Sequence, residues 1–103
     1  MAYHLTTQSG AMERNPSAER MAAVLNSVDP SDEEHPDVSL THESEWCIGV
    51  FASGLVTFEN LADGEPTHMR GLSRQEILDL WQRLARGEID ALRALPWQPG
   101  YGG

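Results

Sequence analysis

Two apolar runs separated by a polar residue and a glycine constrain the fold of this chain most strongly. The stretch "WCIGVFASGLVTFEN", residues 46–60, places Ser53 and Gly54 between runs that are rich in β-branched and aromatic residues. Such a pair between two β-prone runs is typical of a β-hairpin. The sequence therefore predicts adjacent antiparallel strands at residues 46–52 and 55–60.

The length of this turn decides which side chains share a face of the sheet. Side chains alternate along a strand, so a two-residue turn sorts the apolar residues into two sets. The first set is Cys47, Phe51, Val56 and Phe58, and the second is Trp46, Ile48, Val50 and Leu55. Both sets are apolar, so the pattern leaves open which face the helices cover.

The clearest helix begins at "LSRQEI", residues 72–77. Ser73 and Glu76 have the spacing of a capping box, in which each side chain hydrogen-bonds the backbone of the other residue. A helical apolar stripe follows, and Gly87 is typical of a C-terminal cap. The stripe consists of Ile77, Leu80, Trp81 and Leu84. We predict a helix from Arg74 to about Arg86.

Weaker patterns indicate the remaining elements. Pro16 after Asn15 predicts a capped helix over residues 16–28, whose apolar positions recur at helical spacing. Alternation predicts strands at residues 2–8 and 37–42. Three further expectations are a short strand near 67–71, a short helix or turn at 88–95, and loops at 9–15 and 96–103.

These elements predict an α+β fold in a single domain, residues 1–103. We expect an antiparallel β-meander of three to four strands, packed on one face by two helices. The predicted order is strand, helix, three strands, helix, followed by a short C-terminal helix and an aromatic tail at 96–103. Residues 1–15 are expected to form a loosely ordered N-terminus.

The negative charge of the chain is concentrated in its middle. The formal charge is -9, and ten acidic residues but no arginine or lysine lie between Asp29 and Glu65. A field of this sign repels nucleic acid and anionic lipid and attracts basic partners. We therefore expect no direct nucleic-acid binding, no membrane binding, and a basic protein partner.

The single cysteine and the N-terminal residues suggest a cytoplasmic protein. Cys47 excludes an intramolecular disulfide, and its apolar neighbours favour a small buried hydrophobe over a nucleophile. The first seventeen residues lack the basic and apolar regions of a secretion signal, and no apolar run approaches the length of a membrane span.

Side chains that could support catalysis do not form a convincing motif. His35 and His42 are seven residues apart with a proline between them, which matches no compact metal-ligand pattern. A metal enzyme that uses these two histidines is a minor alternative. Paired carboxylates such as Glu43 with Glu45 have no obvious apolar surroundings to raise a pKa. We expect no enzymatic activity, no metal and no cofactor.

The aromatic residues allow two interpretations. Trp81 lies on the helical stripe and is predicted to be core, whereas Trp46 could be core or the rim of a binding face. Trp97 and Tyr101 lie in the tail, either as a strap over apolar surface or as exposed anchors for a partner.

Taken together, "VSLTHESEWCIGVF", "GLVTFEN", "LSRQEILDLWQRLARGE" and the terminal "LPW" resemble the small immunity proteins of bacterial polymorphic toxin systems. The resemblance is to the type encoded beside toxins of the nucleic-acid deaminase superfamily, and it covers residues 16–97 in the order and spacing of elements. It implies an inhibitor that binds a toxin domain and blocks its active site.

We therefore expect a non-enzymatic immunity protein that neutralises a basic toxin domain, one that acts on nucleic acid, through an acidic surface. The expected partner-binding residues are Asp32, Glu33, Glu34, Asp37, Glu43, Glu45, Trp46, Glu59, Asp63 and Glu65, with Trp97 and Tyr101 as possible anchors. The alternative is a small adaptor or secretion chaperone that binds its partner through a helix and the aromatic tail. The sequence leaves the oligomeric state open.

Overall fold

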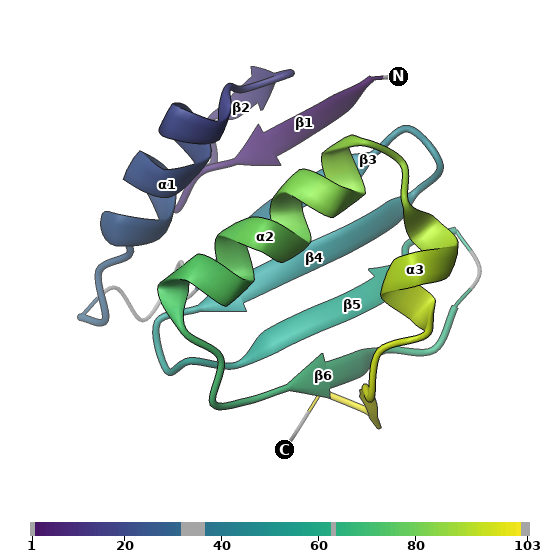
Figure 1. The fold of residues 1–103 in the computed structure, drawn as a ribbon. Coiled ribbons are helices and arrows are strands. Elements are labelled where there is room, and N and C mark those ends of the chain that lie inside the picture. The colour runs from purple at the N-terminus through teal and green to yellow at the C-terminus, as the bar shows by residue number, and fades with distance from the viewer. Residues whose placement is uncertain (1, 32–36, 63, 102–103) are drawn as a thin grey trace.

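A computed structural model describes residues 2–31, 37–62 and 64–101, which form a layer of strands and a layer of helices (Figure 1). The elements, in chain order, are β1 (Tyr3–Thr6), β2 (Met12–Arg14), α1 (Ala18–Asn26), β3 (Asp37–His42), β4 (Trp46–Phe51), β5 (Val56–Asn60), β6 (Thr67–Met69), α2 (Arg74–Ala85), α3 (Ile89–Arg93) and β7 (Gln98–Pro99). The predicted α+β class is confirmed.

The strands form one sheet in the order β2-β1-β3-β4-β5-β6-β7, in which all neighbouring strands are antiparallel. The predicted count of three to four strands is wrong, because the described sheet has seven. Two of them were expected to be loop: β2 has three residues, and β7 has two in the proline- and glycine-rich tail. Strands this short show no alternation that a sequence pattern could detect.

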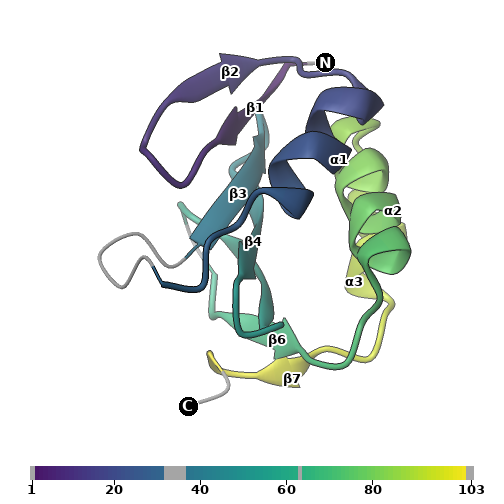
Figure 2. The same cartoon turned by 90° about the vertical axis from the view of Figure 1, so that its left-hand side faces the viewer.

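All three helices lie on one side of the sheet (Figure 2). The other side carries no helix within the described residues, so the sheet has a helix-covered face and a helix-free face. The β1–β2 hairpin belongs to the segment that was expected to be loosely ordered.

The hairpin loop between the paired residues Phe51 and Leu55 has three residues, not the two assumed from the sequence, because the backbone N–H of Phe51 donates to the carbonyl oxygen of Leu55 at 2.9 Å. It ends at Gly54, whose φ of 93° is a left-handed conformation that glycine adopts without steric cost. Ile48 consequently pairs with Phe58, and the predicted faces of β5 are exchanged. The helix-covered face receives Trp46, Ile48, Val50, Val56 and Phe58, and the helix-free face receives Cys47, Gly49, Phe51, Thr57 and Glu59.

Helix α2 supplies the largest fully buried side chain of the core. Trp81 is 0% exposed, and its indole N–H donates to the carbonyl oxygen of Ile48 at 3.1 Å. The predicted capping box is confirmed: Ser73 Oγ accepts from the backbone N–H of Glu76 at 3.1 Å, and Glu76 Oε1 accepts from the backbone N–H of Ser73 at 3.0 Å. These contacts fix where α2 begins and how it lies on the sheet.

Helix α1 begins later than predicted. Its N-cap is Ser17, whose Oγ accepts from the backbone N–H of Arg20 at 3.1 Å. The predicted cap, Asn15, has a φ of 45° and accepts the backbone N–H of Tyr3 at 3.0 Å, so it links β1 to the end of β2. The apolar face of α1 is buried as its spacing predicts.

Candidate functional site at the α3 end of the sheet

Two acidic connections lie at the same end of the sheet. The β3–β4 turn carries Glu43 and Glu45, and the β5–β6 connection carries Glu65; all three residues are exposed. The two connections are joined directly, because the backbone N–H of Leu61 donates to the carbonyl oxygen of Glu45 at 2.9 Å. The fold thus places three of the predicted partner-binding carboxylates at one end of the sheet, with Glu43 and Glu45 lining a cavity beside β1 and β2 and Glu65 lining another.

Three aromatic rings stack beside these connections. Trp46 and Phe58 have ring centroids 4.6 Å apart at an interplanar angle of 21°, and Phe58 and Trp97 have centroids 4.9 Å apart at 23°. The indole N–H of Trp97 donates to the carbonyl oxygen of Leu92 at 2.7 Å, which fixes the ring against α3. Each stacked pair contributes about 0.5–1.5 kcal/mol beyond its buried area. The stack therefore fixes the C-terminal segment on the helix-covered face.

A guanidinium lies over this stack. Arg93 of α3 is exposed, and its guanidinium carbon lies 5.6 Å from the centroid of the Trp46 ring, within the range of a cation–π contact. The neighbouring Leu92 is 0% exposed and anchors α3 in the core. This anchor positions Arg93 at the edge of the sheet.

A cavity of about 550 Å³ opens beside the stack. Its lining residues are Trp46, Phe58, Gly64, Glu65, Thr67, Arg93, Leu95 and Trp97. Three residues predicted from the sequence, Trp46, Glu65 and Trp97, thus meet at one cavity. Phe58 was not predicted as a site residue, because a two-residue turn would put its side chain on the face opposite Trp46. No sequence signal identifies Arg93.

Other predicted residues lie away from this cavity. Asp37 and Glu59 are on the helix-free face, and Asp37 begins β3 at the opposite end of that strand from Glu43. The acidic residues therefore do not form one continuous surface on a single face. Four of the predicted residues lie outside the described part of the chain: Asp32, Glu33, Glu34 and Asp63.

The C-terminal segment crosses the edge of the sheet. Trp97 packs on the helix-covered face, β7 pairs with β6, and Tyr101 reaches the helix-free face. The exposed Tyr101 hydroxyl donates to the Glu59 carboxylate, with distances of 2.8 and 3.0 Å to its two oxygens. This hydrogen bond raises the pKa of Tyr101, because loss of the phenolic proton would place two anions in contact.

Ion pairs between described residues use other carboxylates. They are Arg20 with Glu13 at 2.6 Å, Arg83 with Asp79 at 2.8 Å, and Arg86 with Glu88. Glu43, Glu45 and Glu65 belong to none of these pairs. Within the described residues, their negative charge is therefore not neutralised by a salt bridge.

Cys47 does not lie in the apolar core where its neighbours in the sequence suggested. It is half-buried on the helix-free face, between Thr41 and Glu59. Burial raises the pKa of the thiol and the charges of Glu59 and Asp37 raise it further, although hydrogen bonds with Thr41 and Ser39 lower it. A thiol that stays protonated is a poor nucleophile.

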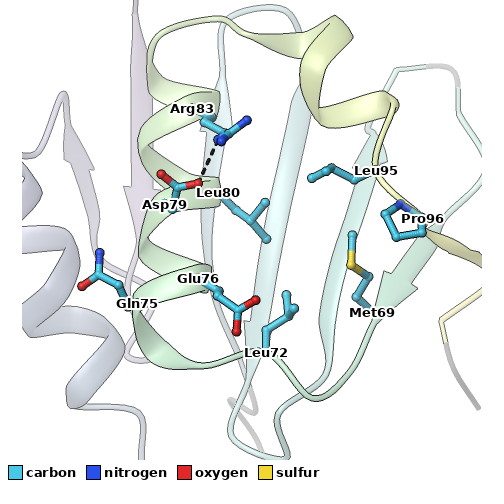
Figure 3. Close-up of a pocket in the computed structure, with 9 residues that line it drawn as sticks. All are labelled: Met69, Leu72, Gln75, Glu76, Asp79, Leu80, Arg83, Leu95 and Pro96. Carbon is cyan, nitrogen blue, oxygen red and sulfur yellow. Dashed lines mark hydrogen bonds and ion pairs between the residues drawn. The ribbon is translucent and has the colours of Figure 1, made fainter.

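A second cavity, of about 520 Å³, lies between α2 and the segment that follows α3 (Figure 3). Its apolar lining is Met69, Leu72, Leu80, Leu95 and Pro96, and its polar lining is Gln75, Glu76, Asp79 and Arg83. Arg83 Nε donates to Asp79 Oδ2 at 2.8 Å across this polar edge. Because Leu95 lines both cavities, the second cavity adjoins the first.

Residues 2–31, 37–62 and 64–101 contain neither a metal-binding cluster nor a membrane-spanning helix. No group of three or more His, Cys, Asp or Glu side chains there is placed to hold a metal ion. Of the two histidines considered for a metal, His35 lies outside these ranges, and His42 is buried with its Nδ1 2.7 Å from Ser44 Oγ. None of the helices in these ranges has the length and apolar character needed to cross a membrane.

The molecule was also compared with known proteins. No family model, no curated protein and no solved structure matches this chain.

Proposed function

We propose that the protein is a non-enzymatic immunity protein that binds a basic toxin domain and blocks its active site. The observation that carries this proposal is the cavity lined by Trp46, Glu65 and Trp97, at the end of the sheet that also carries the exposed Glu43 and Glu45. Aromatic residues surrounded by charged residues are typical of protein interfaces, in which tryptophan often contributes most of the binding energy.

Charge supports a toxin that acts on nucleic acid. An enzyme that binds nucleic acid has a basic cleft, and carboxylates placed in that cleft can substitute for phosphates. The chain offers such carboxylates at Glu43, Glu45 and Glu65, within a molecule of formal charge -9. Electrostatic attraction of this kind mainly accelerates association and excludes partners of the wrong charge. The resemblance to deaminase-associated immunity proteins points to the same class of partner.

The proposal is tested first by capture of the partner. The tagged chain is incubated with lysate of its source organism, washed at low and at high salt, and the retained proteins are identified by mass spectrometry. A retained basic toxin domain is then purified, and its activity on nucleic acid is measured with and without this protein. We expect stoichiometric inhibition, and a toxin that stays active in the presence of excess protein would refute the proposal.

Charge reversal then tests the location of the interface. E43K combined with E45K should lower the association rate about tenfold or more at low salt, because both carboxylates are exposed at the end of the sheet where the cavity opens. E19K is the control, since Glu19 is an exposed carboxylate in the first turn of α1. A double variant that associates as fast as the unmodified protein would show that the toxin binds elsewhere.

The second cavity favours one alternative function. An adaptor or secretion chaperone could hold an apolar segment between α2 and Pro96, which is exposed and lines only that cavity. P96D places a charge in this cavity and leaves the first cavity's lining intact. An adaptor would lose its partner with this variant, whereas the proposed immunity protein would keep its toxin.

A further inference from the structure

We propose that the cavity at the α3 end binds an arginine side chain of the partner, in the place that Arg93 occupies over Trp46. This inference rests on the proposed function, since it names the group of the toxin that the cavity recognises. In this proposal, Arg93 occupies the place over Trp46 in the free protein and leaves it when the partner binds.

The first support is that the site already holds a guanidinium. Trp46 is the aromatic side chain with the strongest attraction for cations, and Phe58 stacks on it and fixes its ring. The Arg93 guanidinium lies 5.6 Å from the ring centroid. The geometry that a partner's arginine needs is thus present within the chain.

The second support is the weak attachment of Arg93. It is exposed, and it takes part in none of the ion pairs between described residues. Its contact with Trp46 is therefore a solvent-exposed cation–π contact, which is among the weaker contacts in a protein. Rotation of the Arg93 side chain into solvent would vacate the ring at little cost.

The third support is the charge around the ring. Glu65 lines the cavity, and Glu43 and Glu45 lie at the same end of the sheet. Glu43 and Glu45 line a different cavity, beside β1 and β2, so the carboxylate at this cavity is Glu65. Its charge disfavours an anion and favours a cation in place of Arg93. Arginine fits better than lysine because its planar group can stack on a ring while it donates two parallel hydrogen bonds to a carboxylate.

A ligand titration tests the site without the toxin. The probe is Nα-acetyl-arginine amide, and its neutral isostere Nα-acetyl-citrulline amide is the matched control. Binding is read from the indole N–H signals in nuclear magnetic resonance, with Trp46 assigned through Trp46→Phe. We expect a saturable shift of the Trp46 signal with the arginine probe and a much smaller shift with citrulline. Trp81, which is buried and bonded to Ile48, should not respond.

R93A gives the most distinctive prediction, because its expected effect is opposite to the usual one. Truncation of an interface arginine usually weakens binding. Here it should tighten binding of the arginine probe about two- to fivefold, which corresponds to the loss of one exposed cation–π contact. E65Q should weaken binding by a similar factor, about two- to fivefold. Both side chains are exposed, and an unchanged signal from Trp81, which does not line the cavity, would show that the variants keep the fold.

R93A also makes the protein more negative, which by itself strengthens the long-range attraction for a cationic probe. This electrostatic effect must be separated from the loss of the Arg93 contact with Trp46. The titration is therefore repeated in about 0.5 M salt, where charges more than a few ångströms apart are screened. R74A is the control, since Arg74 is exposed at the other end of α2 from α3 (Figure 1). The gain from R93A should persist in high salt, and R74A should have no effect there.

Several results would overturn the inference. They are an equal response to citrulline, weaker or unchanged probe binding by R93A, and a gain from R93A that disappears in high salt.

The inference and the proposed function can fail separately. If the toxin is captured and inhibited but binds R93A no more tightly than the unmodified protein, the inference fails and the function stands. If no toxin is inhibited but the probe behaves as expected, the cation site stands and the immunity function falls.

Discussion

The two faces of the sheet bury their residues by different means. On the helix-covered face, Leu5, Leu40 and Ile48 are 0% exposed because helices pack over them. On the helix-free face, Thr41 and Thr57 are only 7% and 5% exposed, although no described helix covers them. Their side chains are short and lie among those of neighbouring strands. Burial on one face thus comes from a second layer, and on the other from close contact within the sheet.

Gly49 lies close to its neighbours on the helix-free face. A Cβ added there would lie 2.7 Å from Thr57 Oγ1 and 3.7 Å from Asp37 Oδ2. The first distance is shorter than any ordinary contact between such atoms, so a side chain at this position would force Thr57 or the strand to shift. On the helix-covered face large apolar side chains fill the space between the layers. On the helix-free face the absence of a side chain at Gly49 makes room for the Thr57 hydroxyl.

The largest predicted effect compares neighbouring residues on opposite faces of β3. L40A should lower the free energy of unfolding by about 2–5 kcal/mol, because it leaves a cavity beneath the helices. S39A should lower it by less than about 1 kcal/mol, since Ser39 is half-buried and contributes a hydrogen bond to Cys47. Both free energies are measured by urea unfolding. Equal losses would show that the helix layer adds nothing to burial on its face.

The sequence predicted the positions of the central strands and of α2 better than the rest of the fold. Helix α2 and the strands β3, β4 and β5 combine a clear period with a cap or a turn, so their positions could be read directly. The faces of β5 could not be predicted, because they depend on the loop length. A loop longer by one residue moves each side chain of β5 to the other face of the sheet. Strands β2 and β7 are formed by pairing with β1 and β6, which no local pattern reveals.

The intermediate prediction tests whether Gly49 is required by Thr57. G49A should cost about 1–3 kcal/mol of stability, because the new methyl group would overlap Thr57 Oγ1. T57A removes that oxygen, so G49A should cost about 1 kcal/mol less in the T57A background. T57S keeps the oxygen and should give no such relief. Relief by T57S equal to that by T57A would show that the Thr57 methyl group, not its hydroxyl, excludes a side chain.

The candidate site was predictable only in part, for a similar reason. Glu65 could be predicted because it is a carboxylate in the acidic part of the chain. Trp46 and Trp97 could be predicted because they are aromatic residues at the start of a strand and in the C-terminal tail. That they meet depends on a three-residue loop, which puts Phe58 between the two tryptophans, and on the short helix α3. Both are decided by packing between segments far apart in the sequence.

The smallest predicted effect concerns a carboxylate on the helix-free face. Burial raises the pKa of Asp37 above its ordinary value of 3.8, so the folded protein binds this proton more tightly than the unfolded chain does. The ionised carboxylate therefore costs stability above the folded-state pKa, and the cost disappears as the pH falls below the unfolded value. D37N should raise the urea midpoint at neutral pH and lose this advantage near about pH 3. D90N, at an exposed carboxylate of α3, gives the background response of the chain. A lower midpoint for D37N at neutral pH would mean that the hydrogen bond of this carboxylate with the backbone outweighs the cost of its burial.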